Sequence, residues 1–366
     1  MEEIDLAIIG GGVVGLACAC ETARPGRTVC LLERHPRLGN ETSTHNSGVI
    51  HSGIYYPTGS LKARLCREGR ETLYSFCANH KVAYRRSGKL IIADGSKSDA
   101  GLRLLLDRGL ANGVNDLEII SAKTIHKLEP NVAGRFALWS PSTGIVDAEG
   151  LVRALQHEAL KQNTIVLPAM PLIGGDAYQD WVEIRTPVEV IRARAVVNAA
   201  GLEADRVSAM LGGKAFRIYP CRGEYAELLG DSRGWVSRPV YPLPSSTGGH
   251  LGVHITPTTW GTVTIGPTSH YLEDKHDHEN QRLPVEAFIE PTRNLLPSVR
   301  PADLRLGGTG IRAKLSSDPA AFSDFLIERD SKQPPLIHAA GIDSPGLTAC
   351  ISIARQIAGL VDEILN

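Results

Sequence analysis

The sequence lacks a long apolar segment, an excess of charge and a positively charged start. Apolar residues make up 42% of the 366 residues, but no run approaches the roughly eighteen that a membrane-spanning helix needs. The net charge of −1 provides no basic field for nucleic acid or for an anionic lipid surface. The first residues, Met1-Glu2-Glu3, are acidic where a secretion signal is basic. These absences disfavour nucleic-acid-binding, membrane-spanning and secreted proteins.

Paired cysteines are also lacking. The seven cysteines are scattered along the chain, and none belongs to a C-x-x-C pair. Cys18 and Cys20 fall in an expected helix and Cys30 in an expected strand, where cysteine acts as a small apolar side chain. The odd number and the wide spacing indicate reduced thiols and no metal site. We therefore expect a cytoplasmic protein, with peripheral contact at the inner membrane left open.

The most informative stretch runs from Ile4 to Glu33. Its first apolar run, Leu6–Ile9, suits a buried parallel strand and leads into the G-x-G-x-x-G spacing of Gly10-Gly11-Gly12-Val13-Val14-Gly15. Small, helix-compatible residues follow from Leu16 to Ala23, and a second apolar run, Val29–Leu32, ends at Glu33. This order of strand, glycine turn, helix and acid-terminated strand predicts a dinucleotide-binding unit.

Each glycine of this unit has its own expected role. Gly10 permits the tight turn, Gly12 lets the backbone approach a pyrophosphate, and Gly15 lets the helix pack closely on the strand. The pyrophosphate would lie at the helix N-terminus, and Glu33 would accept a ribose hydroxyl. An acid at this place argues against NADP, whereas the glycines do not choose between FAD and NAD. A glycine-rich turn in another α/β unit is the alternative.

The remaining pattern indicates two interleaved domains, as the length of the chain favours. Strands ending in Ala199-Ala200-Gly201 and Ala339-Ala340-Gly341 return to the pattern of the N-terminal unit, whereas residues 216–334 alternate short strands with Pro- and Gly-rich turns. Helical spacing predicts helices over residues 61–80, 102–110, 148–161, 285–296 and 349–365, the third of them capped by Asp147. We predict an α/β (α+β) fold with a Rossmann-like three-layer domain of residues 1–82, 144–214 and 335–366. A mostly antiparallel substrate domain would comprise residues 83–143 and 215–334.

The distribution of these dinucleotide elements resembles that of the FAD-dependent D-amino acid oxidase superfamily. Within it, the chain is similar to the L-2-hydroxyglutarate dehydrogenase (oxidase) family, essentially from end to end. The matching segments are His45–Tyr56, Ser60–Cys66, Ser140–Asp147, Leu251–His254, Gly310–Arg312 and Ser344–Thr348. The long segment His45–Tyr56 is much more specific than the glycine pattern.

The resemblance implies FAD as cofactor and oxidation of (S)-2-hydroxyglutarate to 2-oxoglutarate by hydride transfer to flavin N5. Electrons would pass to a quinone, to another dye-like acceptor or to oxygen. His45 stands where some relatives attach flavin covalently, but we expect non-covalent FAD. The expected cofactor contacts are Gly10, Gly12, Val13, Val14, Gly15, Glu33, Arg34, Thr44, His45, Asn46, Ser47, Val49, Ala200, Gly201, Gly310, Gly341, Ser344, Pro345, Gly346, Leu347 and Thr348.

Oxidation of a 2-hydroxy acid requires a group that takes the hydroxyl proton, and a neutral imidazole suits this role near pH 7. His51 and His254 lie in matching motifs and are the two candidates. We favour His254, because it lies on a strand of the substrate domain, which should cover the flavin. A general base contributes roughly 10²–10⁴-fold, so His254→Ala should lower turnover by that factor.

The expected substrate carries two negative charges, so two cationic contacts are expected. Arg312 matches the arginine that binds substrate carboxylate in several superfamily members, and its guanidinium can pair bidentately. Lys314 follows two residues later and would point the same way from a strand. Further candidates for the distal carboxylate are Tyr55, Tyr56, Tyr241, Lys62, Arg64 and Arg222.

Rival functions remain at this point. The same fold could serve an amine or amino-acid oxidase of the glycine oxidase type, or an oxidase of another 2-hydroxy acid such as malate or lactate. A nicotinamide-dependent dehydrogenase would use the same glycine turn, and a non-catalytic flavoprotein would bind FAD without reacting with a hydroxy acid.

Overall fold

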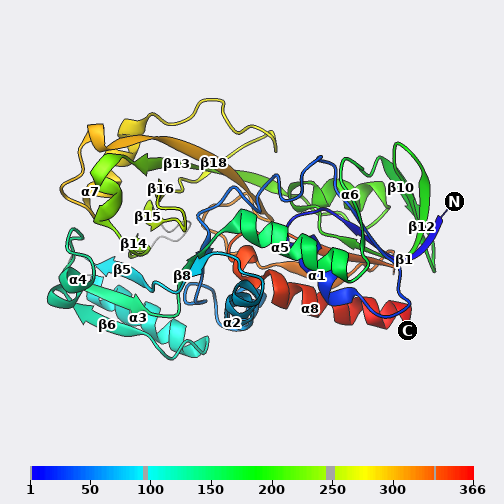
Figure 1. Cartoon of the computed structure of the whole chain (residues 1–366), viewed down its shortest axis with the longest axis horizontal. Helices are drawn as coiled ribbons and strands as arrows, with labels where there is room; N and C mark the ends of the chain where they lie inside the picture. Colours follow the sequence, from blue (N-terminus) through cyan, green and yellow to red (C-terminus); the bar gives the residue numbers. More distant parts are fainter. Residues whose placement is uncertain (1, 94–97, 245–251, 334) are drawn as a thin grey trace.

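The computed structural model describes residues 2–93, 98–244, 252–333 and 335–366 (Figure 1). An eight-stranded sheet forms the first half of the molecule, in the order β10-β11-β12-β1-β2-β9, with β20 paired to β12 and β19 to β20. Its parallel centre is β1 (Glu2–Ile9), β2 (Val29–Leu32), β9 (Ile165–Leu167), β12 (Val190–Asn198) and β20 (Leu336–Ala340). Antiparallel strands complete it: β10 (Gly174–Ala177), β11 (Val182–Arg185) and β19 (Leu326–Arg329).

Both faces of this first sheet are buried, which explains the unbroken apolar run of β1. Leu6 and Ile8 face one apolar core, whereas Ala7 and Ile9 face another on the opposite side. The first core is shared with α1 (Val13–Thr22), α2 (Leu61–Asn79), α5 (Ala148–Lys161) and α8 (Gly346–Leu365), and α6 (Ala204–Met210) lies on the other side. The sheet therefore lies between two layers, as predicted for the Rossmann-like domain.

A nine-stranded sheet forms the second half of the molecule, in the order β17-β13-β16-β15-β14-β5-β7-β6, with β18 paired to β13. Its strands are β5 (Lys89–Ala93), β6 (Glu118–Ser121), β7 (Phe136–Ser140), β13 (Tyr219–Leu228), β14 (Val240–Pro242), β15 (His254–Pro257), β16 (Val263–Gly266), β17 (His270–Tyr271) and β18 (Leu304–Lys314). All of its pairings are antiparallel except that of β14 with β5, so a mostly antiparallel second sheet is confirmed.

Shorter elements connect the two sheets. A three-stranded sheet joins β3 (Val49–Ile50), β8 (Gly144–Val146) and β4 (Tyr84–Arg85). The helices α3 (Ser98–Ala111), α4 (Ala122–Leu128) and α7 (Ile289–Arg293) lie at the end of the second sheet in Figure 1. Within the described residues, no helix is both long enough and apolar enough to cross a bilayer.

The predicted elements and the structure differ in a few places. The predicted helix 285–296 is a 3-10 turn, Val285–Phe288, followed by the short α7, and the closing helix begins at Gly346 rather than Ala349. β19 lies in the stretch assigned to the substrate domain but pairs with β20 in the first sheet. Leu251, the first residue of one matching motif, lies outside the described residues. The domain boundaries stay a prediction, and sheet membership favours a boundary before β19 instead of at residue 334.

Candidate functional site

A cavity of about 1400 Å³ runs between the two sheets. Its lining combines the glycine turn after β1, the loop of residues 39–57, the turn after β12, the inner face of the second sheet and the turn before α8. These segments are far apart in the chain, and they meet because the carboxyl ends of the parallel strands β1, β12 and β20 lie at one edge of the first sheet. Ligands of open α/β sheets bind at such an edge.

The glycine turn has the geometry that the sequence predicts. Gly10 has a φ of +112°, and a Cβ there would lie 2.5 Å from the carbonyl oxygen of Ala199. A Cβ on Gly15 would lie 1.9 Å from the carbonyl oxygen of Gly10, so this glycine permits helix α1 to pack on the turn. The N-cap residue Gly12 has no side chain, Ser43 Oγ accepts a hydrogen bond from the N–H of Val13 (3.0 Å), and no acidic residue lies in the first turn of α1. This helix N-terminus therefore suits phosphate oxygens.

Glu33 lies at the end of β2 with 8% of its surface exposed and lines the cavity. Its two carboxylate oxygens accept hydrogen bonds from the backbone N–H of Gly11 (2.7 Å) and of His35 (2.8 Å). A carboxylate has about four acceptor positions, so a ribose hydroxyl can still bind. Glu33 thus also closes the glycine turn, a structural role that sequence reasoning missed.

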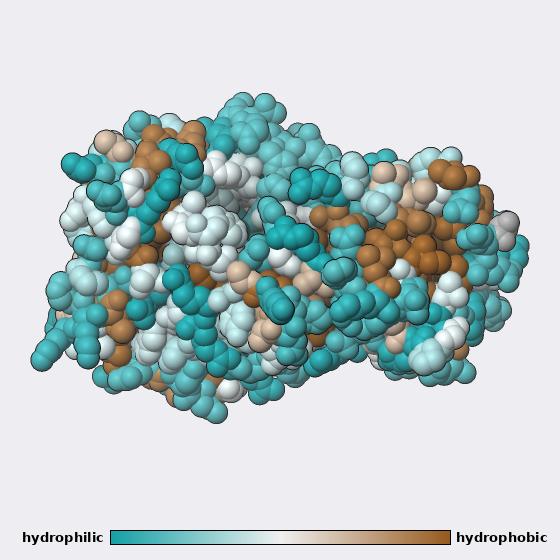
Figure 2. Space-filling model, viewed as in Figure 1, coloured by the Kyte–Doolittle hydropathy of each residue, from teal (hydrophilic) through white to brown (hydrophobic). Residues whose placement is uncertain are grey.

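Three apolar side chains line the cavity from the segment after β9 (Met170 and Leu172) and from the end of α6 (Met210). Figure 2 shows apolar surface gathered over the same half of the molecule, where Figure 1 has α6 and β10. A flat aromatic ring such as adenine would bury its faces against these side chains. Their signal in the sequence is weak, because the segment around residue 170 has no regular apolar period.

The turn before α8 approaches the cavity next to His51. Ser344 Oγ lies 3.2 Å from His51 Nε2 and 3.3 Å from Tyr56 Oη, and the backbone N–H of His51 donates to Thr348 Oγ1 (3.0 Å). Burial, and secondly the positive charge of Lys89, lower the pKa of His51 to about 3. The imidazole is therefore neutral around pH 7 and can accept a proton, although a bound anion must raise its pKa for efficient transfer.

His254 begins β15 and lines the cavity with 6% of its surface exposed. Its ring stacks on Tyr241 of the neighbouring strand β14, with centroids 3.5 Å apart and planes 9° apart. Burial raises the pKa values of Tyr55, Tyr56 and Tyr241, which remain protonated hydrogen-bond donors at neutral pH. The cavity lining therefore includes both candidate bases, His51 and His254, and the three predicted tyrosines.

Arg312 and Lys314 line the cavity from the same face of β18, as the two-residue spacing predicts. Arg312 donates to the carbonyl oxygens of Thr268 (2.7 Å) and Cys221 (3.4 Å). Within the described residues neither cation forms an ion pair. The two carbonyls fix the guanidinium and leave it other N–H donors for a carboxylate.

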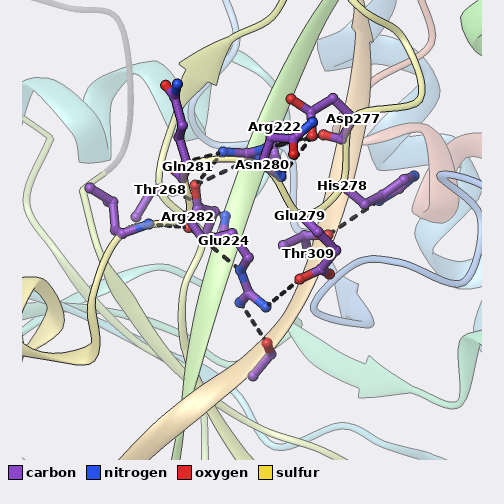
Figure 3. Close-up of polar contacts among 12 residues, drawn as sticks. Arg222, Glu224, Thr268, Asp277, His278, Glu279, Asn280, Gln281, Arg282 and Thr309 are labelled. Carbon is purple, nitrogen blue, oxygen red and sulfur yellow. Dashed lines mark hydrogen bonds and ion pairs between the residues drawn. The ribbon is translucent and has the colours of Figure 1, made fainter.

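A buried network that includes Arg222, Glu224 and Thr268 (Figure 3) holds the turn whose Thr268 carbonyl oxygen accepts from Arg312. Arg222 donates to Glu224 Oε1 at 3.2 and 3.0 Å and lies 3.4 Å from Asp277, and 2% of its side chain is exposed. Glu224 and Thr268 are joined by two hydrogen bonds, Glu224 N to Thr268 Oγ1 (3.0 Å) and Thr268 N to Glu224 O (3.1 Å). Arg222 does not line the cavity and is paired with Glu224, which disfavours its suggested contact with a substrate carboxylate.

Of the predicted cofactor and substrate residues, most line the cavity. These are Gly10, Gly12, Val13, Val14, Glu33, Arg34, His45, Asn46, Ser47, Val49, Ala200, Gly201, Gly310, Ser344, Pro345, Gly346, Leu347, His51, Tyr55, Tyr56, Tyr241, His254, Arg312 and Lys314. Lys62 also lines it, but its ammonium is paired with Asp343 at 2.6 Å, and the exposed Arg64 lies outside.

Four predicted cofactor residues lie behind the lining instead. Gly15 permits helix packing, and Thr44 donates to the carbonyl oxygen of Gly39 (2.7 Å). Gly341 has a φ of +65° and makes room for Leu315. Thr348 is fully buried and donates to the carbonyl oxygen of Val49 (3.3 Å) while accepting from His51. These four residues support the segments that line the cavity.

Sequence reasoning missed Tyr225, which lines the cavity from β13 and whose hydroxyl lies 3.1 Å from Ser47 Oγ. β13 pairs with β18, with Gly223 opposite Gly310 and Cys221 opposite Arg312. The period of two along residues 219–228 is a signal for its inward orientation, but the pairing with β18 is needed to know which face lies inward.

Comparison with known proteins identifies the class. The family model described as FAD dependent oxidoreductase matches residues 5–360. The chain is 33% identical to the mitochondrial L-2-hydroxyglutarate dehydrogenase of Arabidopsis thaliana, covering 98% of this chain and 83% of the relative. It is 30% identical to the human mitochondrial enzyme of that name (99% and 89%) and to the Salmonella houtenae enzyme (98% and 93%).

A solved structure shares the fold. The dithionite-reduced L-alpha-glycerophosphate oxidase of Mycoplasma pneumoniae, with FAD bound, superposes with a TM-score of 0.90 at 25% identity and covers 99% of this chain and 95% of its own. The chain is thus an FAD-dependent oxidoreductase of mixed α/β fold. Among these enzymes it belongs to the L-2-hydroxyglutarate dehydrogenase family, and the predicted family and fold class are confirmed.

Proposed function

We propose that this protein oxidises L-2-hydroxyglutarate to 2-oxoglutarate. The observation that carries the proposal is the position of Arg312: a guanidinium fixed by two carbonyl oxygens, without a carboxylate partner in the described residues, in the cavity that His51 and His254 also line. The relatives named for this activity cover nearly the whole chain.

The residues of the cavity fit FAD. The turn of Gly10 and Gly12 has no room for side chains, because a Cβ on Gly12 would lie 2.8 Å from Ser43 Oγ. The α1 N-terminus would hold the pyrophosphate, Glu33 the ribose, and the turn at Ser344–Leu347 the polar edge of the flavin ring. When bound, FAD supplies the acceptor for the hydride that leaves Cα.

The chain itself binds and deprotonates the substrate. Arg312 would pair bidentately with the carboxylate beside the reacting carbon, and Lys314 adds a second cation on the same face. His254 would accept the hydroxyl proton, because its strand places it in the cavity wall opposite the glycine turn, with His51 as the alternative.

The proposal also covers how FAD is attached to the protein and which acceptor takes its electrons. FAD would be bound non-covalently: His45 Nδ1 lies 3.0 Å from the carbonyl oxygen of Glu41, so a backbone contact already orients this ring. Protein precipitated with acid should release its yellow colour, and colour that stays with the pellet would contradict this. A quinone, a dye-like acceptor or oxygen would take up the electrons, and the expected location remains cytoplasmic with peripheral contact at the inner membrane left open.

Anaerobic mixing tests the proposed reaction. Purified holoenzyme is mixed with L- or D-2-hydroxyglutarate, L-malate or L-lactate, and the flavin absorbance is followed. We expect L-2-hydroxyglutarate to bleach the flavin fastest and the D-enantiomer not to react. Bleaching by glycine or another amine, with release of ammonia, would instead indicate an amine oxidase. No reduction by any hydroxy acid would refute the proposal.

A further inference from the structure

A lysine is buried behind the cavity wall, and the described part of the chain provides no carboxylate to pair with it. Lys89, on β5, has 0% of its surface exposed, and its Nζ lies 4.5 Å from the ring centroid of Tyr55 and 4.6 Å from that of Tyr241. Within the described residues Nζ has no hydrogen-bond acceptor and no ion pair. Ser140, opposite Lys89 on β7, has its hydroxyl engaged with Ser52.

A buried, unpaired ammonium destabilises the folded protein unless a group from outside the chain pairs with it. A buried ammonium costs several kcal/mol, so it either loses its proton or attracts an anion. Burial lowers the pKa of Lys89 to about 7, and the thiol of Cys66 opposes this shift only in part. The lysine is therefore poised to change its charge near neutral pH.

Two further polar atoms of the same wall are also without partners. His51 Nδ1 and Tyr55 Oη are buried and make no hydrogen bond in the described part of the chain. More than nine in ten buried polar groups are normally satisfied. His51 and Tyr55 line the cavity and Lys89 does not, so a polar ligand there could pair directly with the first two and act on Lys89 only through the tyrosine rings. Each can donate a hydrogen bond, and the chemistry that pairs with donors and a cation is an anion.

The two tyrosines connect Lys89 to the cavity. Both line it, and His254 stacks on one face of Tyr241 at 3.5 Å, so the ammonium lies over the other face. The ring of Tyr241 thus contacts both the buried ammonium of Lys89 and the imidazole of His254, one of the candidate bases. The cation can thus act on the cavity through the rings that it contacts.

We propose that Lys89 is a positioning residue for the dianionic substrate: it takes up a proton as the second carboxylate enters the cavity, and its charge holds the tyrosine wall against that carboxylate. This inference rests on the proposed function. A neutral Lys89 would avoid the cost of a buried charge while the cavity is empty. Uptake of a proton would then make the cavity wall more positive when a dicarboxylate binds.

The neighbouring titratable groups do not provide the same proton. Burial raises the pKa values of Tyr55 and Tyr241 and raises that of Cys66 to about 12, so all three stay protonated below pH 9. His51, with a pKa of about 3, stays neutral above pH 6 unless the ligand raises it. His254 is the remaining neighbour, and the variants below keep it.

Binding of 2-oxoglutarate to the oxidised holoenzyme tests the inference without turnover. Its Kd is followed from pH 6 to 9 by the flavin absorbance, and proton uptake is measured by calorimetry at pH 8 in buffers of different ionisation heat. For the wild type we expect uptake approaching one proton at pH 8 and a Kd that rises up to about tenfold per pH unit above pH 7. Pyruvate, with one carboxylate, should bind without this uptake.

Three variants separate Lys89 from its neighbours. Lys89→Met should abolish the uptake and weaken binding about tenfold at pH 6, whereas Lys89→Arg, which is always charged, should abolish the uptake but bind tightly at every pH. The exposed Lys127→Met is the control and should behave as the wild type. Uptake that persists in Lys89→Met or in Lys89→Arg would assign the proton to a histidine and overturn the inference.

The outcome for the wild type also distinguishes the two proposals. If 2-oxoglutarate binds the wild type without proton uptake, the inference is wrong while the proposed function stands. If 2-oxoglutarate does not bind and L-2-hydroxyglutarate does not reduce the flavin, both are wrong.

Discussion

Replacement of Arg312 by methionine is the sharpest test of the substrate site. Its guanidinium has five N–H donors, and the carbonyl oxygens of Thr268 and Cys221 use two of them. A bidentate pair with a carboxylate then adds two charge-assisted hydrogen bonds of about 1.5–3 kcal/mol each. Their loss should lower kcat/KM for L-2-hydroxyglutarate by about 10²–10⁴-fold. Arg312→Lys keeps the charge without the fork and should recover only part of that loss.

The assay is steady-state reduction of a dye acceptor, with FAD content measured from the absorbance of the same sample. FAD content should be unchanged, because the glycine turn and Glu33 lie on the other sheet from Arg312. The matched control is Arg305→Met on the same strand, since Arg305 is exposed and pairs with Glu227 at 2.7 Å. A kcat/KM of Arg312→Met within threefold of the wild type would refute the assignment of Arg312 to the substrate carboxylate.

Four further changes have defined expected outcomes. His254→Ala should lower kcat by roughly 10²–10⁴-fold with FAD retained, and an unchanged kcat in stopped-flow flavin reduction would remove His254 as the base. Gly10→Ala places a Cβ 2.5 Å from a backbone oxygen, so the purified protein should contain little FAD by absorbance; full occupancy would contradict this. Glu224→Gln breaks a buried ion pair with Arg222, and urea unfolding should show a loss of about 3–5 kcal/mol, whereas a loss below 1 kcal/mol would show the pair to be dispensable. His51 has a pKa of about 3 in the folded protein and an ordinary value of 6.5. Its contribution to the free energy of unfolding is therefore complete above pH 6.5 and decreases by about 1.4 kcal/mol per pH unit toward pH 3. His51→Gln should flatten this dependence of the unfolding free energy on pH.

The local parts of the fold could be predicted because their causes are local. β1 and α1 follow from an apolar run and three glycines, and α5 spans the predicted residues 148–161 because Asp147 caps it by accepting from the N–H of Gly150 (2.9 Å). In contrast, β10 has the sequence Gly-Gly-Asp-Ala and no apolar pattern; it exists because its backbone pairs with β11. Such a strand is set by tertiary pairing, which propensity does not report.

The same distinction applies to the candidate site. Arg312 and Lys314 could be placed on one face from their spacing alone, and both line the cavity. Lys89 could not be found in this way, since it stands among the apolar residues of β5 and reads as the start of a strand. Its importance arises from the rings of Tyr55 and Tyr241, which are 34 and 152 residues away in the chain and come together only in the fold.

The interleaving of the first sheet has a consequence for synthesis of the protein. β12 pairs with β1 on one side and with β20 on the other, and the core that covers β1 includes α8. While a ribosome is still translating the middle of the chain, β1 can pair with β2 but lacks β12 on its other side, and α1 lacks α8. The apolar core that α8 shares with β1 and α1 can therefore be completed only after the C-terminal residues have been synthesised.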